Sequence, residues 1–198
     1  MSMQRTAIID TTTLVSFTYL KDLGIFHYLR SYFHRVHIPT KVKTEYEAML
    51  GREPSREWVL ERLRLNEGFY SLCTKYDLIT LQIYKTVAGI DDGEAEAAAQ
   101  QKVVGATYIL SDDVIFSNAL KQIDRHIKVI TTLHVIALLD MNQLLSNRDE
   151  ILRTFHRRRK FKSIHLRQAY TEIVAGLGLQ MHKKVLNAKT SMKALGLA

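Results

Sequence analysis

The sequence predicts an α/β protein, with helices on both faces of a parallel sheet and a basic helical extension at the C-terminal end. Two observations indicate this fold: short apolar runs alternate with amphipathic stretches, and the apolar runs stop near residue 147. Such alternation is typical of βαβ units with right-handed crossovers. The chain has 198 residues, 46% of them hydrophobic, which is enough to bury a full core.

Five apolar runs are the expected strands, each short enough for a buried strand of a parallel sheet. They cover residues 6–10, 35–38, 69–73, 107–110 and 127–130. Helices are expected over much of 12–33 and over 40–50, 54–66, 75–87, 93–104, 113–122 and 132–145. Pro39 follows the second strand and Pro54 lies near the start of a helix, where proline is favoured.

The last quarter of the chain has a different pattern. Apolar residues at spacings of four, three and four predict a helix there, ended by Gly176 and Gly178. These residues are Leu166, Tyr170, Ile173 and Leu177. We therefore expect a main domain over residues 1–147 and a basic helical extension over residues 148–198.

Positive charge is concentrated in this extension. Residues 151–198 contain 11 Lys and Arg against the single acid Glu172, a net charge of +10, whereas residues 1–150 contain 17 against 19. Such a polycation attracts nucleic acid, because binding releases counterions condensed on the phosphates; the alternative is a solvated helix that aids solubility. The candidate phosphate-binding residues are Arg153, Arg157, Arg158, Arg159, Lys160 and Lys162. Phe155 and Phe161 lie among them, and we favour packing on the main domain over stacking on bases for both.

Several other classes of site are excluded. The single Cys73 rules out an internal disulfide and a thiolate zinc cluster, and the eight histidines include no His-x-x-x-His pair. The phosphate-binding loops Gly-x-x-x-x-Gly-Lys and Gly-x-Gly-x-x-Gly are missing. No apolar run approaches the roughly 20 residues that span a bilayer, and the N-terminus lacks a signal-peptide pattern. We expect a soluble, cytoplasmic protein that does not contact a membrane.

Acidic residues recur where an expected strand gives way to a helix. Asp10 follows the first strand, Asp112 and Asp113 follow the fourth, and the cluster 91–96 opens an alanine-rich helix. The carboxyl ends of parallel strands meet at one edge of a sheet, so we expect these acids to converge. Converging carboxylates raise one another's pKa unless a hard divalent cation neutralises them.

Each acid taken singly is also explained as a helix cap. Asp91 and Glu94 have the spacing of a capping box, and Asp10 and Asp112 each precede an expected helix. A chain that needed only caps, however, could use Ser, Thr or Asn at these positions. The joint pattern therefore favours a shared site.

Four acidic motifs carry a resemblance to a known family. They are Ile8-Ile9-Asp10-Thr11-Thr12, Pro39-x-x-Val42-x-x-Glu45, Asp91-x-Gly93-Glu94-Ala95-Glu96-Ala97 and Ser111-Asp112-Asp113. In order and spacing they resemble the motifs of PIN-domain ribonucleases over about residues 5–145. The third is similar to that of a subgroup with Gly-Glu-Ala-Glu in place of a lone Asp, so Glu94 and Glu96 are both candidate ligands.

The resemblance implies a three-layer α/β/α domain and metal-dependent hydrolysis of RNA phosphodiester bonds. The candidate catalytic residues are Asp10, Glu45, Glu94, Asp112 and Asp113, of which all but Glu45 are candidate direct ligands of Mg²⁺ or Mn²⁺. Asp91 and Glu96 are further candidate acids. The Thr12 hydroxyl either orients a ligand or substrate or bonds to helix backbone. A divalent cation would activate water and offset the charge that develops on the phosphate.

We therefore expect a metal-dependent endoribonuclease acting on single-stranded RNA. The family suggests the toxin of a toxin–antitoxin pair, with an antitoxin protein or a second copy of the chain as candidate partners. Two alternatives stay open. One is a catalytically weak nucleic-acid-binding or scaffolding module whose acids are caps, and the other is a DNA-directed nuclease in phage defence.

Overall fold

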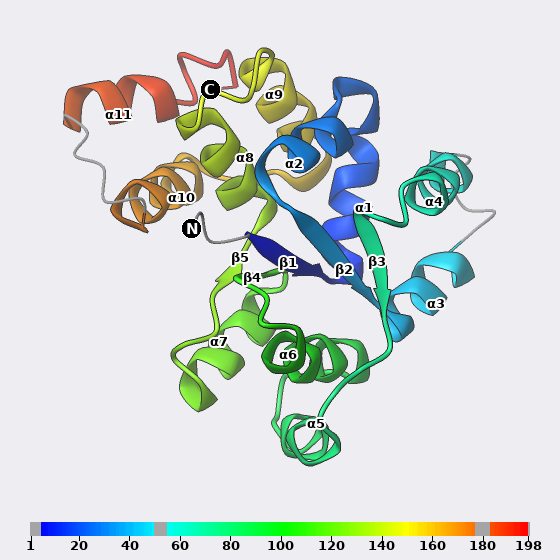
Figure 1. Ribbon diagram of the computed structural model, residues 1–198. Coiled ribbons are helices and arrows are strands. Elements are labelled where there is room, and N and C mark those ends of the chain that lie inside the picture. The colour runs from blue at the N-terminus through cyan, green and yellow to red at the C-terminus, as the bar shows by residue number, and fades with distance from the viewer. Residues whose placement is uncertain (1–4, 50–54, 177–182, 198) are drawn as a thin grey trace.

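Five strands form one parallel sheet in the computed structural model, which describes residues 5–49, 55–176 and 183–197 (Figure 1). The strands are β1 (Thr6–Ile9), β2 (Arg35–Pro39), β3 (Tyr70–Cys73), β4 (Tyr108–Leu110) and β5 (Val129–Ile130). Their order across the sheet is β3-β2-β1-β4-β5, and every neighbouring pair is parallel. All five expected apolar runs contain a strand, which confirms the predicted α/β class.

Helices fill the connections and the C-terminal part of the chain. They are α1 (Thr11–Tyr19), the 3-10 turn η1 (Lys21–Leu23), α2 (Ile25–Tyr32), α3 (Thr40–Ala48), α4 (Ser55–Leu65), α5 (Leu78–Lys85), α6 (Asp92–Val104), α7 (Val114–Ile123), α8 (Thr132–Met141), α9 (Arg148–Arg159), α10 (Ser163–Gly176) and α11 (Lys183–Thr190). The expected helical stretch over 12–33 is divided at Gly24, whose φ of 79° favours glycine and lets the chain turn before α2. Leu177 and Gly178 lie outside the described residues.

The sheet is the middle of three layers, with helices on both of its faces. Successive side chains of a strand point to opposite faces, so neighbouring residues pack against different helical layers. On one face, which α5, α6 and α7 cover, Ile109 packs with Phe116 and Leu120 of α7. On the other, Ile9 and Leu110 belong to a larger core formed with α1, α2, α8 and α9 (Figure 1). The predicted three-layer α/β/α arrangement is therefore confirmed.

The basic C-terminal helices share this larger core. Buried residues of α9 and α10 belong to it, namely Ile151, Leu152, Phe155, Leu166, Ala169, Tyr170 and Ile173. Phe155 and Phe161 stack on each other with their ring centroids 5.8 Å apart, and both are buried. Packing of these two rings on the main domain, as favoured from the sequence, is confirmed. The division between residues 147 and 148 stays a prediction, and the helices on both sides of it contribute to one core.

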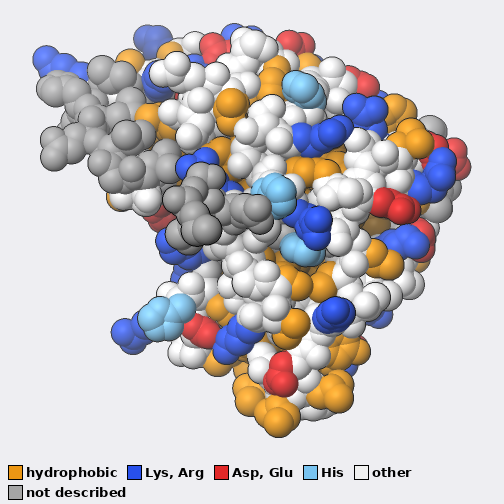
Figure 2. All heavy atoms as spheres, in the orientation of Figure 1, with side chains coloured by type: hydrophobic (Ala, Val, Ile, Leu, Met, Phe, Trp, Pro, Cys, Tyr) orange, Lys and Arg blue, Asp and Glu red, His pale blue; other side chains and the backbone are white. Residues whose placement is uncertain are grey.

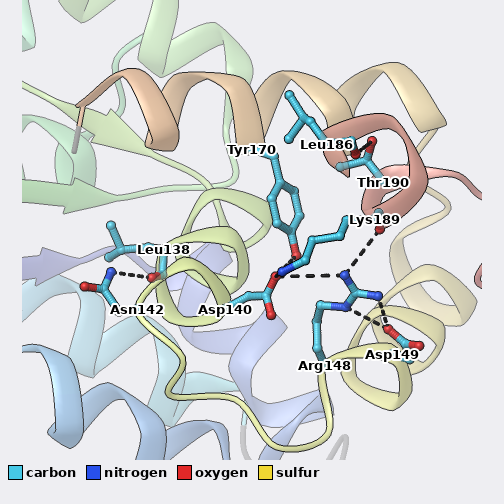
Figure 3. A network of polar contacts seen from close by, with 9 residues as sticks. All are labelled: Leu138, Asp140, Asn142, Arg148, Asp149, Tyr170, Leu186, Lys189 and Thr190. Atoms are coloured by element: carbon cyan, nitrogen blue, oxygen red, sulfur yellow. Dashed lines mark hydrogen bonds and ion pairs between the residues drawn. The ribbon is translucent and has the colours of Figure 1, made fainter. Parts of the chain in front are cut away.

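A polar network attaches the last helices to α8. The carboxylate of Asp140 accepts a hydrogen bond from the Tyr170 hydroxyl at 2.9 Å, and the Lys189 and Arg148 cations lie 3.6 and 3.9 Å from the same oxygen (Figure 3). Arg148 also contacts Asp149. Because these residues come from α8, α9, α10 and α11, one carboxylate joins four helices.

The surface over α5 is apolar. Figure 2 shows hydrophobic side chains gathered at the lower end of the molecule, where Leu78, Ile79 and Ile83 are 65%, 74% and 51% exposed. An exposed apolar patch of this kind marks a surface suited to another macromolecule. Within the described part of the chain, no helix is both long and apolar enough to cross a membrane.

Candidate active site

Helix starts from three motifs meet at the carboxyl edge of the sheet. β1 and β4 are neighbours, with Ile9 paired to Leu110, so the residues that follow them leave the sheet side by side. Asp10 caps α1 by accepting from the Thr13 N–H, and Asp113 caps α7. Asp91 caps α6 and, like Asp10 and Asp113, lies close enough to Glu94 to raise its pKa. The predicted convergence of the first, third and fourth motifs follows from this topology.

Asp10 is the most buried of these acids, with 3% of its surface exposed. Its carboxylate accepts the Thr13 N–H at 2.8 Å and the Thr12 hydroxyl at 2.9 and 3.0 Å. Burial raises the pKa of Asp10 to about 6, and the nearby Asp112 carboxylate adds to the rise, against hydrogen bonds that lower it. A bound cation would stabilise the charged form of this buried carboxylate.

Glu94 is in the same electrostatic environment. It completes a capping box, because its carboxylate accepts the Asp91 N–H at 2.9 Å while Asp91 accepts the Glu94 N–H at 2.8 Å. Burial raises the pKa of Glu94 to about 7, and the carboxylates of Asp91, Asp113 and Asp10 contribute to the rise. The capping interpretation of Asp91 and Glu94 is therefore confirmed, and Glu94 also lies near the carboxylates of the first and fourth motifs.

Glu96, the other candidate of the third motif, faces elsewhere. One of its carboxylate oxygens accepts the Thr40 N–H and the Gln100 side-chain amide, each at 3.0 Å. Thr40 begins α3, so Glu96 accepts a hydrogen bond from a backbone N–H at the start of that helix. Of the two glutamates, the structure brings Glu94 to the acidic cluster.

Glu45 reaches the cluster from α3. Its carboxylate accepts the Thr11 hydroxyl at 2.6 Å and lies against the first turn of α6. A Cβ atom added to Gly93 would lie 3.2 Å from one Glu45 oxygen and 3.5 Å from an Asp91 oxygen. Because Gly93 has no side chain, there is room for the Glu45 carboxylate next to the start of α6.

Asp112 has a different role from its neighbour Asp113. Its carboxylate accepts the Thr132 N–H at 2.7 Å, the Thr132 hydroxyl at 2.7 Å and the Ser16 hydroxyl at 2.6 Å. The expectation that Asp112 caps the helix that follows is wrong, because the Phe116 N–H bonds to Asp113, at 2.9 Å. Asp112 instead ties the start of α8 to α1.

Thr12 connects the first and fourth motifs. Its hydroxyl donates to the Asp10 carboxylate and accepts the backbone N–H of Asp112 at 3.1 Å. Thr12 thus contacts the candidate ligand Asp10, and the backbone group that it binds belongs to the loop after β4 and not to its own helix. Sequence reasoning missed Ser16 and Thr132. Thr132 lies two residues after the end of β5, at the same edge of the sheet at which Asp10 follows β1, so its position was a usable signal.

The carboxylate oxygens suit a hard cation, although they do not surround a single coordination site in this structure. Among the residues that the structure describes, no three Asp, Glu, His or Cys side chains are close enough to hold one metal ion. The chemistry still fits, because Asp10 and Asp113 both raise the pKa of Glu94 and all three supply carboxylate oxygens. A divalent cation would remove this mutual repulsion.

The candidate phosphate-binding residues are divided by the structure. Arg153 donates to the backbone oxygen of Leu195 at 2.9 Å and so holds the C-terminal turn. Arg159 reaches the acidic site, donating to the Ser16 hydroxyl and to the Thr12 backbone oxygen at 3.2 Å each. The others are exposed on the outer side of α9 or just after it: Arg157, Arg158, which lies over the Tyr19 ring, Lys160 and Lys162.

Comparison with known proteins places this geometry in context. Residues 6–175 match a family model described as a PIN domain. A search of curated proteins found no significant match. Among solved structures, the crystal structure of PAE2754 from Pyrobaculum aerophilum aligns with a TM-score of 0.49 and 15% identity, over 71% of this chain and 99% of that chain.

Proposed function

Because the chain belongs to the PIN-domain family, whose members are generally nucleases, we propose that it is a metal-dependent endoribonuclease. The family match agrees with the resemblance seen in the four acidic motifs, and it continues beyond residue 145 to include α9 and most of α10. The Gly-Glu-Ala-Glu subgroup stays a prediction.

The observation that carries the proposal is the pair of buried carboxylates Asp10 and Glu94. They come from different motifs, and their pKa values are raised to about 6 and about 7. A helix cap does not require a buried carboxylate, since Ser, Thr or Asn would cap as well without the desolvation of a charged group. A buried acidic pair of this kind is typical of a functional site.

We assign the roles as follows. Asp10, Glu94 and Asp113 would hold Mg²⁺ or Mn²⁺, and Glu45 lies beside them at the start of α6. When bound, the cation supplies a more acidic water and offsets negative charge on the phosphate. Thr12 orients the Asp10 carboxylate, and Asp112 fixes the position of α8.

Single-stranded RNA is the proposed substrate. The net charge of +10 over residues 151–198 supports a polyanion, and Arg159 brings part of that charge to the acidic site. A DNA strand of the same base sequence, assayed in parallel, tests the alternative of a DNA-directed nuclease.

The decisive experiment compares two aspartates that both cap helices. Asp10 caps α1 inside the acidic site, and Asp77 caps α5 on the exposed surface. Asn caps nearly as well as Asp, so neither Asp10→Asn nor Asp77→Asn should unfold the protein. We expect Mn²⁺-dependent cleavage that EDTA abolishes, a more than tenfold loss (about 1.4 kcal/mol of barrier) in Asp10→Asn, and full activity in Asp77→Asn. Undiminished cleavage by Asp10→Asn would refute the mechanism.

One observation favours a second candidate, a catalytically weak nucleic-acid-binding module. Asp10, Asp91 and Asp113 all act as helix caps, and no three candidate ligands within the described ranges already share a cation position. This candidate predicts RNA binding by the wild type without cleavage at any Mn²⁺ concentration.

The biological role that we propose is that of the toxin in a toxin–antitoxin pair. An antitoxin or a second copy of the chain would cover apolar surface, and the exposed Leu78, Ile79 and Ile83 of α5 offer such a surface. Size-exclusion chromatography with light scattering separates a monomer from a dimer.

A further inference from the structure

A groove of about 570 Å³ opens beside the acidic site. It is lined by α7, the start of α8, the end of α9 and the first turns of α10, and Asp112 is one of its lining residues. The groove therefore joins the fourth acidic motif to the basic helices.

Cations and hydrogen-bond donors line this groove together with the two carboxylates of Asp112 and Glu172. Lys121 comes from α7, Lys160 directly follows α9, and His165 comes from α10; all three are exposed. The His165 Nδ1 atom accepts the Lys162 N–H at 3.4 Å, so the neutral ring carries its proton on Nε2, which is a donor. Donors from three separate helices suit a polyanion that passes between them.

Lys160 is held in an unusual backbone conformation. Its φ of 48° and ψ of 47° lie in the left-handed region, which costs free energy for any residue except glycine. The buried, stacked rings of Phe155 and Phe161 lie on either side of it in the sequence. Helices commonly end on a residue in this conformation, and Lys160 ends α9 with its N–H bonded to the His156 backbone oxygen, which places its side chain at the edge of the groove.

Arg159 links the groove to the acidic site. It lines the groove, and its guanidinium bonds to the Ser16 hydroxyl and the Thr12 backbone oxygen. The Ser16 hydroxyl in turn donates to Asp112 at 2.6 Å. A strand lying in the groove would therefore contact the element that positions Asp10.

We propose that this groove binds the phosphodiester backbone of the RNA strand as it leads to the acidic site, with Lys121, Lys160 and His165 contacting phosphates. The proposal rests on the proposed function for the identity of the strand. Phosphate contacts position a strand without reading its bases, so this binding is independent of base sequence.

The test measures binding by fluorescence anisotropy over a salt series. All proteins carry Asp10→Asn and are kept in EDTA, so cleavage does not enter the measurement. The groove variant is Lys121→Gln, Lys160→Gln and His165→Gln. The matched control is Arg5→Gln, His34→Gln and Arg35→Gln, three exposed residues at the amino ends of β1 and β2 on the opposite edge of the sheet.

Each lysine that contacts a phosphate of single-stranded nucleic acid contributes about 0.7 to the log–log salt slope, so losing two should flatten it by about 1.4. We expect this change and a loss of affinity of at least tenfold in the groove variant, with neither in the control. An unchanged slope, or an equal change in the control, overturns the proposal. So does failure of the parent protein to bind RNA.

A second variant separates binding from folding. Lys160→Gly relieves the left-handed backbone, so the unfolding midpoint should rise by roughly 2 °C while RNA binding weakens. A stabilised protein that binds RNA as tightly as before overturns the assignment of Lys160. If the groove binds RNA but the protein is not a nuclease, the wild type binds RNA through the groove and does not cleave it.

Discussion

Asp112 accepts both the backbone N–H and the side-chain hydroxyl of Thr132, each at 2.7 Å. With the Ser16 hydroxyl added, both of its carboxylate oxygens are engaged in holding α8 against α1. Asp113, the next residue, uses one oxygen to cap α7 and lies near enough to Glu94 to raise its pKa. Two adjacent aspartates therefore have separable roles.

Asp112→Asn should destabilise the fold, whereas Asp113→Asn should not. The amide that replaces the Asp112 carboxylate offers one acceptor oxygen in place of two, and a buried donor left without a partner costs about 1–3 kcal/mol. The amide that replaces the Asp113 carboxylate still caps α7. Urea denaturation of both variants in EDTA measures the difference, and cleavage assays should show Asp113→Asn to be inactive although stable. Equal stability of the two variants would contradict the separation of roles.

The free energy of unfolding of the metal-free protein should fall as pH rises from about 4 to about 7. The pKa values of Asp10 and Glu94 are raised to about 6 and about 7, so the folded state binds more protons than the unfolded state in this window. Stability therefore decreases as the two groups ionise, by on the order of 2 kcal/mol. Thermal melts of the wild type and of Asp10→Asn across this range test the sign, because the variant should lose much of the slope.

Added Mn²⁺ should reverse this loss above about pH 7, since a ligand that binds only the folded state stabilises it. Asp77→Asn is the control, because Asp77 is an exposed cap whose own pKa is lowered by the Thr80 N–H. A wild-type melting temperature that does not respond to millimolar Mn²⁺ would favour the binding-module candidate.

Gly93→Ala should reduce cleavage without reducing stability. An added Cβ would lie 3.2 Å from a Glu45 oxygen, so the Glu45 carboxylate has to move away from the start of α6. Alanine is favoured over glycine inside a helix by about 1 kcal/mol, which offsets the displacement. Gly176→Ala is the control, because nothing lies within 4 Å of its added Cβ. We expect a cleavage rate about tenfold lower only in Gly93→Ala, and equal rates in both variants would show that the Glu45 position does not matter.

Local patterns predicted the strands and the position of the acids well. The apolar run before Asp10 ends at the edge of the sheet because its residues pack on both faces, and that information is local. The sequence also shows that Glu94 and Glu96 cannot both be ligands, although it does not show which of them faces the cluster. Residues two apart lie about 200° apart around a helix, so only one of them can face the cluster.

Other features depend on contacts that no local pattern contains. Arg159 bonds to Ser16 and Thr12, which are more than 140 residues away in the sequence. Arg153 is a similar cation in the same helix, yet it bonds to the Leu195 backbone. Helix packing decides which cation reaches the acidic site, and packing follows from the whole fold.

Tyr170→Phe should weaken the attachment of the C-terminal helices. The variant keeps the ring in the core and removes the donor to Asp140, leaving that carboxylate with the cations of Arg148 and Lys189 (Figure 3). The loss of one such hydrogen bond should lower the free energy of unfolding by about 1–2 kcal/mol. Urea denaturation measures it, with Tyr76→Phe on the exposed loop before α5 as the control. An unchanged midpoint would mean that the Tyr170 hydroxyl contributes nothing to the attachment.

Arg159→Lys should slow cleavage while leaving the charge of the groove unchanged. Lysine keeps the positive charge but cannot bond to Ser16 and Thr12 together, because it lacks the planar fork of the guanidinium. We expect cleavage to fall about five- to tenfold, or roughly 1 kcal/mol of barrier, with the salt dependence of RNA binding unaltered. Arg167→Lys on the exposed face of α10 is the matched control and should retain full activity. Combining Arg159→Lys with Ser16→Ala tests the contact itself, since residues that act through one bond give non-additive losses. Strictly additive losses would show that Arg159 acts on the acidic site by some route other than Ser16.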